Sequence, residues 1–341
     1  MAGRRWRDSQ EIWRHLTLLR LWNMIQVLAS YYVSKMIKRP IQWGMPISLS
    51  VEPTTSCNLR CPECPSGLRS FSRPTGMLDP EFFRNLLKEM SPRLTYLTFY
   101  FQGEPYLNPR FLDMVGEADQ LGLYTVTSTN GHYLTDAMAE ATVKSGLSRL
   151  IVSLDGTTQE TYAAYRVGGS LEKVLEGVKR LVAARKRLSI QRPYIVFQFL
   201  VVKPNEHQVE EARTLAHELG VDDIWFKTAQ IYGYEKGSPL IPDNPIYSRY
   251  ALQEDGSYRF KGKLDNHCWK LWHAPVITWD GTVVPCCFDK DAHHPMGTLQ
   301  ESSFADIWKG PTYAKFRASV LRSRKETDIC TNCSEGTKVW A

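Results

Sequence analysis

Residues 46–64 read PISLSVEPTTSCNLRCPEC and join a strand-like run to three closely spaced cysteines. The run 46–53 has the length and composition of a short strand, and the cysteines follow it directly. A helix is expected to begin at Asp79-Pro80-Glu81, because Asp is a preferred helix cap and Pro suits the first helical position. The segment therefore predicts a strand, a loop that carries three thiols, and a helix.

The same strand and helix alternation continues as far as residue 230. Strands are expected at 46–53, 94–101, 123–128, 148–154, 194–202 and 223–230. Helices are expected from residue 79 and at 110–121, 135–145, 158–188 and 206–219. The helix over 158–188 is expected to be broken near Gly168. Strands that alternate with helices pair in parallel through right-handed crossovers. Six units are too few for a closed eight-stranded barrel. The pattern predicts an α/β fold, a partial (β/α)6 TIM-like barrel.

Four regions are expected along the chain. Residues 1–45 form an N-terminal amphipathic helical extension, and 46–230 form the barrel. Residues 231–267 are turn-rich and read as a connector. Residues 268–341 hold five cysteines and a hairpin signal at Asp280-Gly281, which predicts a small cysteine-rich domain with a helix near 311–324.

The N-terminal extension is expected to be one helix over 10–38, ended by Pro40. Its apolar residues share a broad face: Trp13, Leu16, Leu19, Leu21, Trp22, Ile25, Leu28, Tyr32 and Met36. Such a face usually packs against the rest of the protein. The second interpretation is a peripheral contact with an anionic membrane, favoured by the tryptophans and the basic flanks.

Composition limits the function classes. Of the 341 residues, 43% are apolar and 23% charged, as in soluble globular proteins, and the net charge of +6 is too mixed in sign along the chain to indicate a nucleic-acid partner. No secretory signal and no spanning segment is recognisable in the sequence. We therefore expect a cytoplasmic protein, with membrane association as the alternative. Its eight cysteines are expected to be reduced and to act as metal ligands or nucleophiles.

The first cysteines, Cys57, Cys61 and Cys64, have the spacing C-x3-C-x2-C. Three thiolates can hold three irons of a [4Fe–4S] cluster and leave the fourth iron open to a cofactor or substrate. Ligands of parallel α/β proteins sit at the carboxyl ends of strands, and this loop leaves such an end. Polar or glycine-bearing segments follow three more strands: Gln102–Pro105, Ser128–Gly131 and Ser153–Gly156.

With these motifs, residues 46–230 resemble the radical S-adenosylmethionine superfamily. The resemblance implies that the open iron of the Cys57/Cys61/Cys64 cluster chelates the amino and carboxylate groups of S-adenosylmethionine. It further implies cofactor contacts at the positions that match the family motifs: Gly103, Glu104, Asn130, Ser153 and Arg166. Two positions depart from the usual pattern, because Gln102 replaces a glycine and Glu63 stands where an aromatic residue is common.

Three of these matches have a purely structural alternative. Asp155-Gly156 and Asn130-Gly131 can each be no more than a turn. Arg166 can be a surface residue of a helix.

The C-terminal cysteines follow the spacing Cys268-x12-Gly281-x4-Cys286, with Cys330-x2-Cys333 near the end. This pattern resembles the start of a SPASM or twitch auxiliary domain, and four thiolates suit one fully ligated second [4Fe–4S] cluster. A structural zinc ion on the same four thiolates is the alternative. Cys287 is interpreted as a spare, because adjacent strand residues point to opposite faces.

The resemblance implies reductive cleavage of S-adenosylmethionine to a 5′-deoxyadenosyl radical, which abstracts hydrogen from a substrate. The first interpretation of the overall reaction is oxidation or rearrangement of a small molecule such as a sugar or cyclitol. The second is maturation of a peptide or protein side chain, and the third is a non-catalytic metal-binding scaffold. The enzyme interpretations require a reducing partner such as ferredoxin or flavodoxin.

Overall fold

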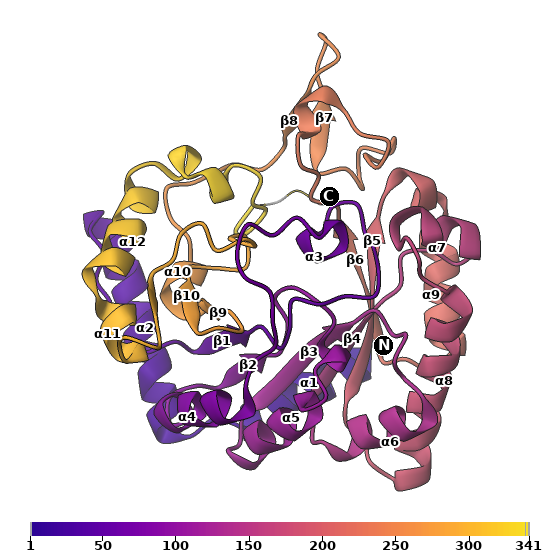
Figure 1. Cartoon of the computed structure of the whole chain (residues 1–341). Helices are drawn as coiled ribbons and strands as arrows, with labels where there is room; N and C mark the ends of the chain where they lie inside the picture. The colour runs from indigo at the N-terminus through magenta and orange to yellow at the C-terminus, as the bar shows by residue number, and fades with distance from the viewer. Residues whose placement is uncertain (1, 338, 340–341) are drawn as a thin grey trace.

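Six parallel strands follow one another in chain order across the main sheet of the computed structural model, which describes residues 2–337 and 339 (Figure 1). They are β1 (Ser48–Val51), β2 (Tyr96–Thr98), β3 (Tyr124–Thr129), β4 (Arg149–Ser153), β5 (Tyr194–Val201) and β6 (Asp223–Thr228). Each pairs in parallel with the next, from Ser48 beside Tyr96 to Val201 beside Thr228. The predicted α/β partial barrel is confirmed.

Helices between these strands cover the outer face of the curved sheet (Figure 1). They are α4 (Pro80–Met90), α5 (Phe111–Gln120), α6 (Asp136–Lys144), α7 (Gln159–Tyr165), α8 (Leu171–Leu188) and α9 (Val209–Glu218). Helix α4 begins as predicted, since the Asp79 side chain accepts a 2.8 Å hydrogen bond from the Phe82 amide. Buried Phe83 and Leu87 of α4 belong to the same core cluster as Leu97 of β2.

The N-terminal extension holds two helices, α1 (Ala2–Arg14) and α2 (Leu18–Ile37), so the prediction of one helix over 10–38 is wrong. The break is local: Thr17 has extended backbone, and its side chain accepts a 3.2 Å hydrogen bond from the Arg20 amide. Buried Asp8 of α1 contacts Arg149 at the start of β4 and the Tyr124 hydroxyl of β3. Helix α1 therefore packs at the amino-terminal ends of the strands.

The C-terminal segment extends the barrel sheet. Strand β9 (Val276–Ile277) pairs in parallel with β1, and β10 (Thr282–Val284) and β11 (Gly297–Thr298) continue the sheet in antiparallel fashion. The hairpin predicted at Asp280-Gly281 joins β9 to β10. Sheet continuity across the predicted region boundary at residue 268 was not foreseen.

The remaining elements are short. The C-terminal helices are α10 (Lys270–His273), α11 (Phe304–Lys309) and α12 (Pro311–Ser323), the last near the position predicted. The connector, expected to be turn-rich, also contains a two-stranded ribbon of β7 (Tyr250–Leu252) and β8 (Tyr258–Phe260), drawn at the top of Figure 1. Short helical segments of three to six residues are α3 (Pro65–Leu68), η1 (Pro105–Leu107), η2 (Lys203–Gln208), η3 (Tyr234–Lys236), η4 (Arg324–Glu326) and η5 (Asp328–Cys330).

Candidate active site

The three cysteines after β1 line one cavity of about 280 Å³ at the carboxyl ends of the strands. Burial raises the pKa of Cys57 to about 11, and the nearby thiols of Cys61 and Cys64 act in the same direction. Cys61 is buried, and Cys57 and Cys64 are partly exposed. Three thiolates around one cavity would repel one another without a cation, whereas iron offsets their charge. This donor set fits a [4Fe–4S] cluster held by three cysteines.

Gly103 packs the turn after β2 directly onto the cysteine loop. Its φ is +74°, and a Cβ atom at this position would lie 2.1 Å from the carbonyl oxygen of Thr54. The Gly103 amide donates to the Ser66 hydroxyl at 2.8 Å, and the Glu104 amide donates to the Ser56 carbonyl at 2.8 Å. Only glycine combines this backbone conformation with such close contact.

Glu104 is buried and held in place by three donors. Its carboxylate accepts hydrogen bonds from the Thr129 hydroxyl at 2.8 Å, the Asn130 amide at 2.7 Å and the Tyr106 amide at 3.3 Å. Burial nevertheless raises the pKa of Glu104 to about 7, against the opposing effect of these hydrogen bonds. The group is thus a fixed acceptor whose charge changes near neutral pH.

Arg166 and Asp155 form an ion pair beside the second cysteine. Arg166 Nε donates to Asp155 at 2.5 Å, and Nη1 lies 3.7 Å from the Cys61 sulfur. Asp155 is fully buried and also accepts from the Leu200 amide at 2.7 Å. A surface position for Arg166 and a mere turn at Asp155 are therefore both wrong, since the pair orients the guanidinium toward the cysteine loop.

Asn130 and Ser153 complete the predicted set. The Asn130 side-chain amide donates to Asn58 at 2.7 Å and lies 3.9 Å from the Cys57 sulfur, while buried Ser153 ends β4. Every cofactor contact predicted from the sequence lines the same cavity as the three cysteines: Gly103, Glu104, Asn130, Ser153 and Arg166. The structure brings these residues together, and their roles stay predictions.

Among the residues that line this cavity and that sequence reasoning missed are Tyr165, Gln198 and Lys290. Gln198 had a signal, because it is the polar residue inside the apolar run YIVFQFLVV of β5. Tyr165 had a weaker one as the neighbour of Arg166. Lys290 had no signal in the sequence, because it belongs to the C-terminal segment and only the tertiary structure brings it to the cavity.

Glu63, which departs from the family pattern, links the cysteine loop to the connector. Its carboxylate accepts a 2.9 Å hydrogen bond from the Tyr232 amide. The Lys290 ammonium lies 5.0 Å from the centre of the Tyr232 ring. Three parts of the chain thus meet at the rim of the cavity.

The four predicted C-terminal ligands are all buried: Cys268, Cys286, Cys330 and Cys333. Burial raises the pKa of Cys330 to about 12 and that of Cys333 to about 11, and the neighbouring cysteine thiols add to both shifts. Arg324 donates to the Cys333 sulfur at 3.5 Å. Four thiols packed beside a cation fit a second, fully ligated cluster.

Cys287 lies to one side of this group. Its sulfur accepts from Lys270 Nζ at 3.5 Å, and its side chain lines a separate cavity of about 700 Å³. Cys287 is also an electrostatic neighbour of Cys286 and Cys333, so its interpretation as a spare stays a prediction.

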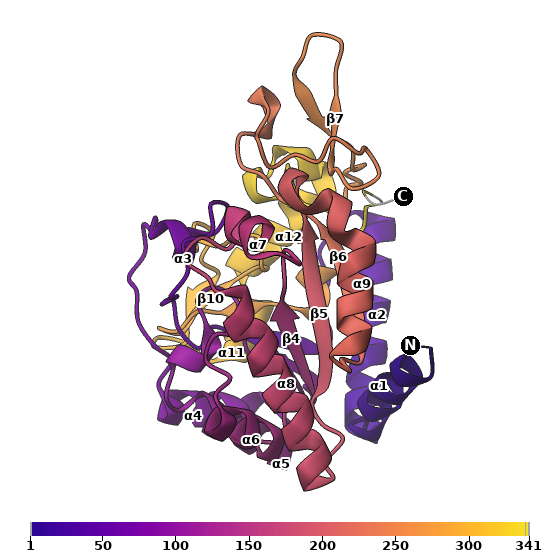
Figure 2. The same cartoon turned by 90° about the vertical axis from the view of Figure 1, so that its right-hand side faces the viewer.

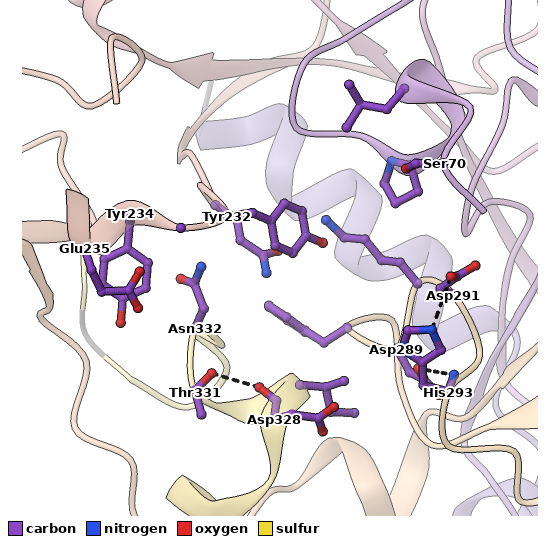
Figure 3. A pocket seen from close by; sticks show the side chains of 17 residues that line it. Ser70, Tyr232, Tyr234, Glu235, Asp289, Asp291, His293, Asp328, Thr331 and Asn332 are labelled. Atoms are coloured by element: carbon purple, nitrogen blue, oxygen red, sulfur yellow. Dashed lines mark hydrogen bonds and ion pairs between the residues drawn. The ribbon is translucent and has the colours of Figure 1, made fainter. Parts of the chain in front are cut away.

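The cavity of about 700 Å³ adjoins the cavity of the three cysteines and is lined by Cys287. It shares five lining residues with the cavity of the three cysteines: Glu63, Tyr165, Gln198, Leu200 and Lys290. A third cavity, of about 560 Å³, adjoins it through Gln230, Phe288 and Lys290. Figure 3 shows Tyr234 and Glu235 on one side of this third cavity and Asp289, Asp291 and His293 on the other. The candidate site therefore consists of three neighbouring cavities that share lining residues.

The sequence matches two protein families in the regions that carry these sites. Residues 51–216 match the Radical SAM superfamily, and residues 268–334 match SPASM, an iron–sulfur cluster-binding domain.

Relatives and solved structures agree with these matches. The tungsten-containing aldehyde ferredoxin oxidoreductase cofactor-modifying protein of Pyrococcus furiosus is 30% identical over 84% of this chain and 86% of its own length. The PqqA peptide cyclase of Gluconobacter oxydans is 28% identical, over 86% and 84%. Streptococcus suis SuiB, solved with precursor peptide SuiA, shares the fold at a TM-score of 0.63 and 14% identity, over 86% and 72%. Sequence, fold and cysteine geometry lead to the same conclusion: this chain belongs to the radical SAM superfamily and carries a C-terminal SPASM-type iron–sulfur domain.

Proposed function

We propose that this radical SAM enzyme is a maturase that modifies a side chain of a peptide or protein. Membership of the superfamily brings a [4Fe–4S] cluster and S-adenosylmethionine, and the SPASM domain brings auxiliary iron–sulfur binding. One relative that matches along most of the chain is named a peptide cyclase and another a mycofactocin maturase. These names favour the maturase interpretation over the small-molecule reaction that the sequence first suggested.

The neighbouring cavities are the structural observation that carries this proposal. Together they run from the three cysteines past Lys290 to the connector, with volumes of about 280, 700 and 560 Å³. A small-molecule site usually encloses its ligand in one pocket of about 300–1,000 Å³. Each of the two further cavities could hold a small molecule by its volume alone, but their succession beside the cofactor space suits an extended peptide.

Within this proposal, the catalytic cluster is held by Cys57, Cys61 and Cys64, and when bound it supplies the electron that cleaves S-adenosylmethionine. Glu104 accepts from the amino group of the cofactor. Arg166, oriented by Asp155, lies toward its carboxylate. Gly103, Asn130 and Ser153 complete the surface against which the cofactor rests.

The auxiliary [4Fe–4S] cluster is assigned to Cys268, Cys286, Cys330 and Cys333, in preference to zinc, because the matched domain is an iron–sulfur domain. The 700 Å³ cavity lies beside Cys287, next to Cys286, so a substrate there would be near both cysteine sites. An electron from the substrate radical can then leave through the auxiliary site. Ferredoxin or flavodoxin is the proposed reductant of the catalytic site.

The test uses the reconstituted full chain under anaerobic conditions with dithionite and S-adenosylmethionine. Each short peptide encoded beside its gene is added in turn, and 5′-deoxyadenosine and peptide mass are followed by mass spectrometry. We expect one peptide to stimulate 5′-deoxyadenosine formation and to change in mass. Stimulation by an amino-cyclitol or sugar, with every such peptide inert, would return the assignment to small-molecule chemistry.

A further inference from the structure

Helix α2 turns a mainly polar side toward the protein, with Val27 and Tyr31 as its buried apolar residues, and a row of apolar side chains toward solvent. Arg20, Asn23, Ser30 and Ser34 are buried, the last two completely. Apolar residues at helical spacing are exposed by 44–88% of their surface: Leu18, Leu21, Trp22, Ile25, Leu28, Tyr32 and Met36. The expectation that this apolar face packs against the main domain is wrong, and the opposite face does so.

Specific hydrogen bonds fix this orientation. Arg20 donates to the carbonyl oxygens of Ser91 and Leu121, both at 3.0 Å, in the loops before β2 and β3. Asn23 donates to the Met45 carbonyl at 2.9 Å and accepts from the Met45 amide at 2.8 Å. Rotating α2 to bury its leucines would leave these buried polar groups without partners. The outward apolar face is therefore a built feature of the fold.

The charged side chains of the segment that contains α2 are all basic. Residues 12–51 contain no Asp or Glu. Arg14 is exposed at the end of α1, just before α2, and Lys35, Lys38 and Arg39 are exposed at the C-terminal end of α2. Arg14 has one acidic partner, Glu11, at 3.0 Å. A second copy of the chain laid against this face would bring basic ends together, whereas anionic lipid headgroups complement them.

Aromatic side chains add a second indication. Trp13 is 70% exposed and Trp22 58%, and both rings have the amphipathic character that concentrates at membrane–water interfaces. None of the helices that the structure describes is long and apolar enough to span a bilayer. An apolar face, basic ends and interfacial aromatics are the features of a helix that lies in the plane of a membrane surface.

We propose that the outward face of α2 docks the chain on an anionic lipid surface. Figure 2 draws α2 on the side of the molecule opposite α3, which follows the cysteine loop. The active-site cavity then faces away from the lipid, and its substrate arrives from the aqueous side.

The test is co-sedimentation of the reconstituted full chain with vesicles of phosphatidylcholine, either alone or mixed with phosphatidylserine as the anionic lipid. We expect binding to the anionic vesicles, much weaker binding to the neutral ones, and weakening in high salt. Trp22→Ser with Ile25→Ser should abolish binding without loss of 5′-deoxyadenosine formation. Leu252→Ser is the matched control, because it removes an equally exposed apolar side chain from β7.

Three outcomes would overturn the proposal. Wild-type chain that stays in the supernatant with anionic vesicles is the first, and unchanged binding by the double variant is the second. The third is a wild-type dimer in light scattering that becomes a monomer in the Trp22→Ser, Ile25→Ser variant. A second copy of the chain would then cover the outward face of α2.

Discussion

Arg166 Nε lies 2.5 Å from the buried carboxylate of Asp155, and this ion pair sets the direction of the guanidinium beside the cysteine loop. Removing one partner of a buried pair leaves the other charge uncompensated, at a cost of about 3–5 kcal/mol. Asp155→Asn should therefore lower the free energy of unfolding by about 3 kcal/mol in urea titrations. It should also weaken S-adenosylmethionine binding.

The exposed pair Lys203–Asp243, 2.9 Å apart, provides the control. Asp243→Asn should change the free energy of unfolding by less than about 1 kcal/mol. Equal effects of the two substitutions would contradict the importance of burial at Asp155.

Glu104 is expected to make cofactor binding depend on pH. Its pKa is raised to about 7 by burial, so the carboxyl group is neutral below that pH and ionised above it. The ionised form is the one that attracts the ammonium group of S-adenosylmethionine. Affinity measured by calorimetry should fall as the pH drops through this pKa, and Glu104→Gln should bind weakly with a flat profile. An identical pH profile in both proteins would remove Glu104 from this role.

The two cysteine sites should lose iron independently. Reconstituted wild-type chain should hold about eight irons, and Cys64→Ala about four, with no 5′-deoxyadenosine formed. Cys330→Ala with Cys333→Ala should also keep about four irons but retain cleavage of S-adenosylmethionine. Wild-type chain with about four irons and one bound zinc would revive the zinc alternative at the C-terminal site.

Cys286 and Cys287 should behave differently despite being adjacent. Cys286 is buried, whereas Cys287 is partly exposed, lies beside Lys270 and lines the cavity of about 700 Å³. Cys286→Ser should lose the auxiliary iron, and Cys287→Ser should keep the wild-type iron and sulfide content. The reverse result would exchange the two assignments.

Gly103→Ala should be strongly destabilising, because it adds a clash to an unfavourable backbone conformation. The new Cβ would lie 2.1 Å from the Thr54 carbonyl oxygen at a φ of +74°. Gly256 has a φ of +82°, and a Cβ added there would meet no atom within 4 Å, so Gly256→Ala isolates the backbone cost, about 1 kcal/mol. A similar melting-temperature decrease for both variants would mean that the cysteine loop yields to the added methyl group.

Local spacing explains how much the sequence could predict. The C-x3-C-x2-C loop and the motifs around Glu104 and Ser153 each follow a strand, and parallel strands bring their carboxyl ends to one edge. The convergence of these segments followed from that rule. The Asp155–Arg166 pair was harder to foresee, because both residues also have ordinary structural uses.

Tertiary packing explains what was missed. The contact of Lys290 with the cavity depends on β9 joining β1, and no local pattern encodes that pairing. In α2, periodicity identified which residues share a face but not which way the face points. The decisive feature was the hydrogen bonding of Arg20 and Asn23 to loop carbonyls far along the chain.

The ladder between β1 and β9 has a consequence for electron flow. Val51 is in register with Ile277, so the strand that leads to the three-cysteine loop is bonded to the hairpin that leads to Cys286. A tunnelling path between the two metal centres would then have a length set by sheet geometry. The rate of electron transfer along this path should be insensitive to solvent viscosity. In an enzyme whose redox centres lie on domains that move about a hinge, that rate would depend on viscosity.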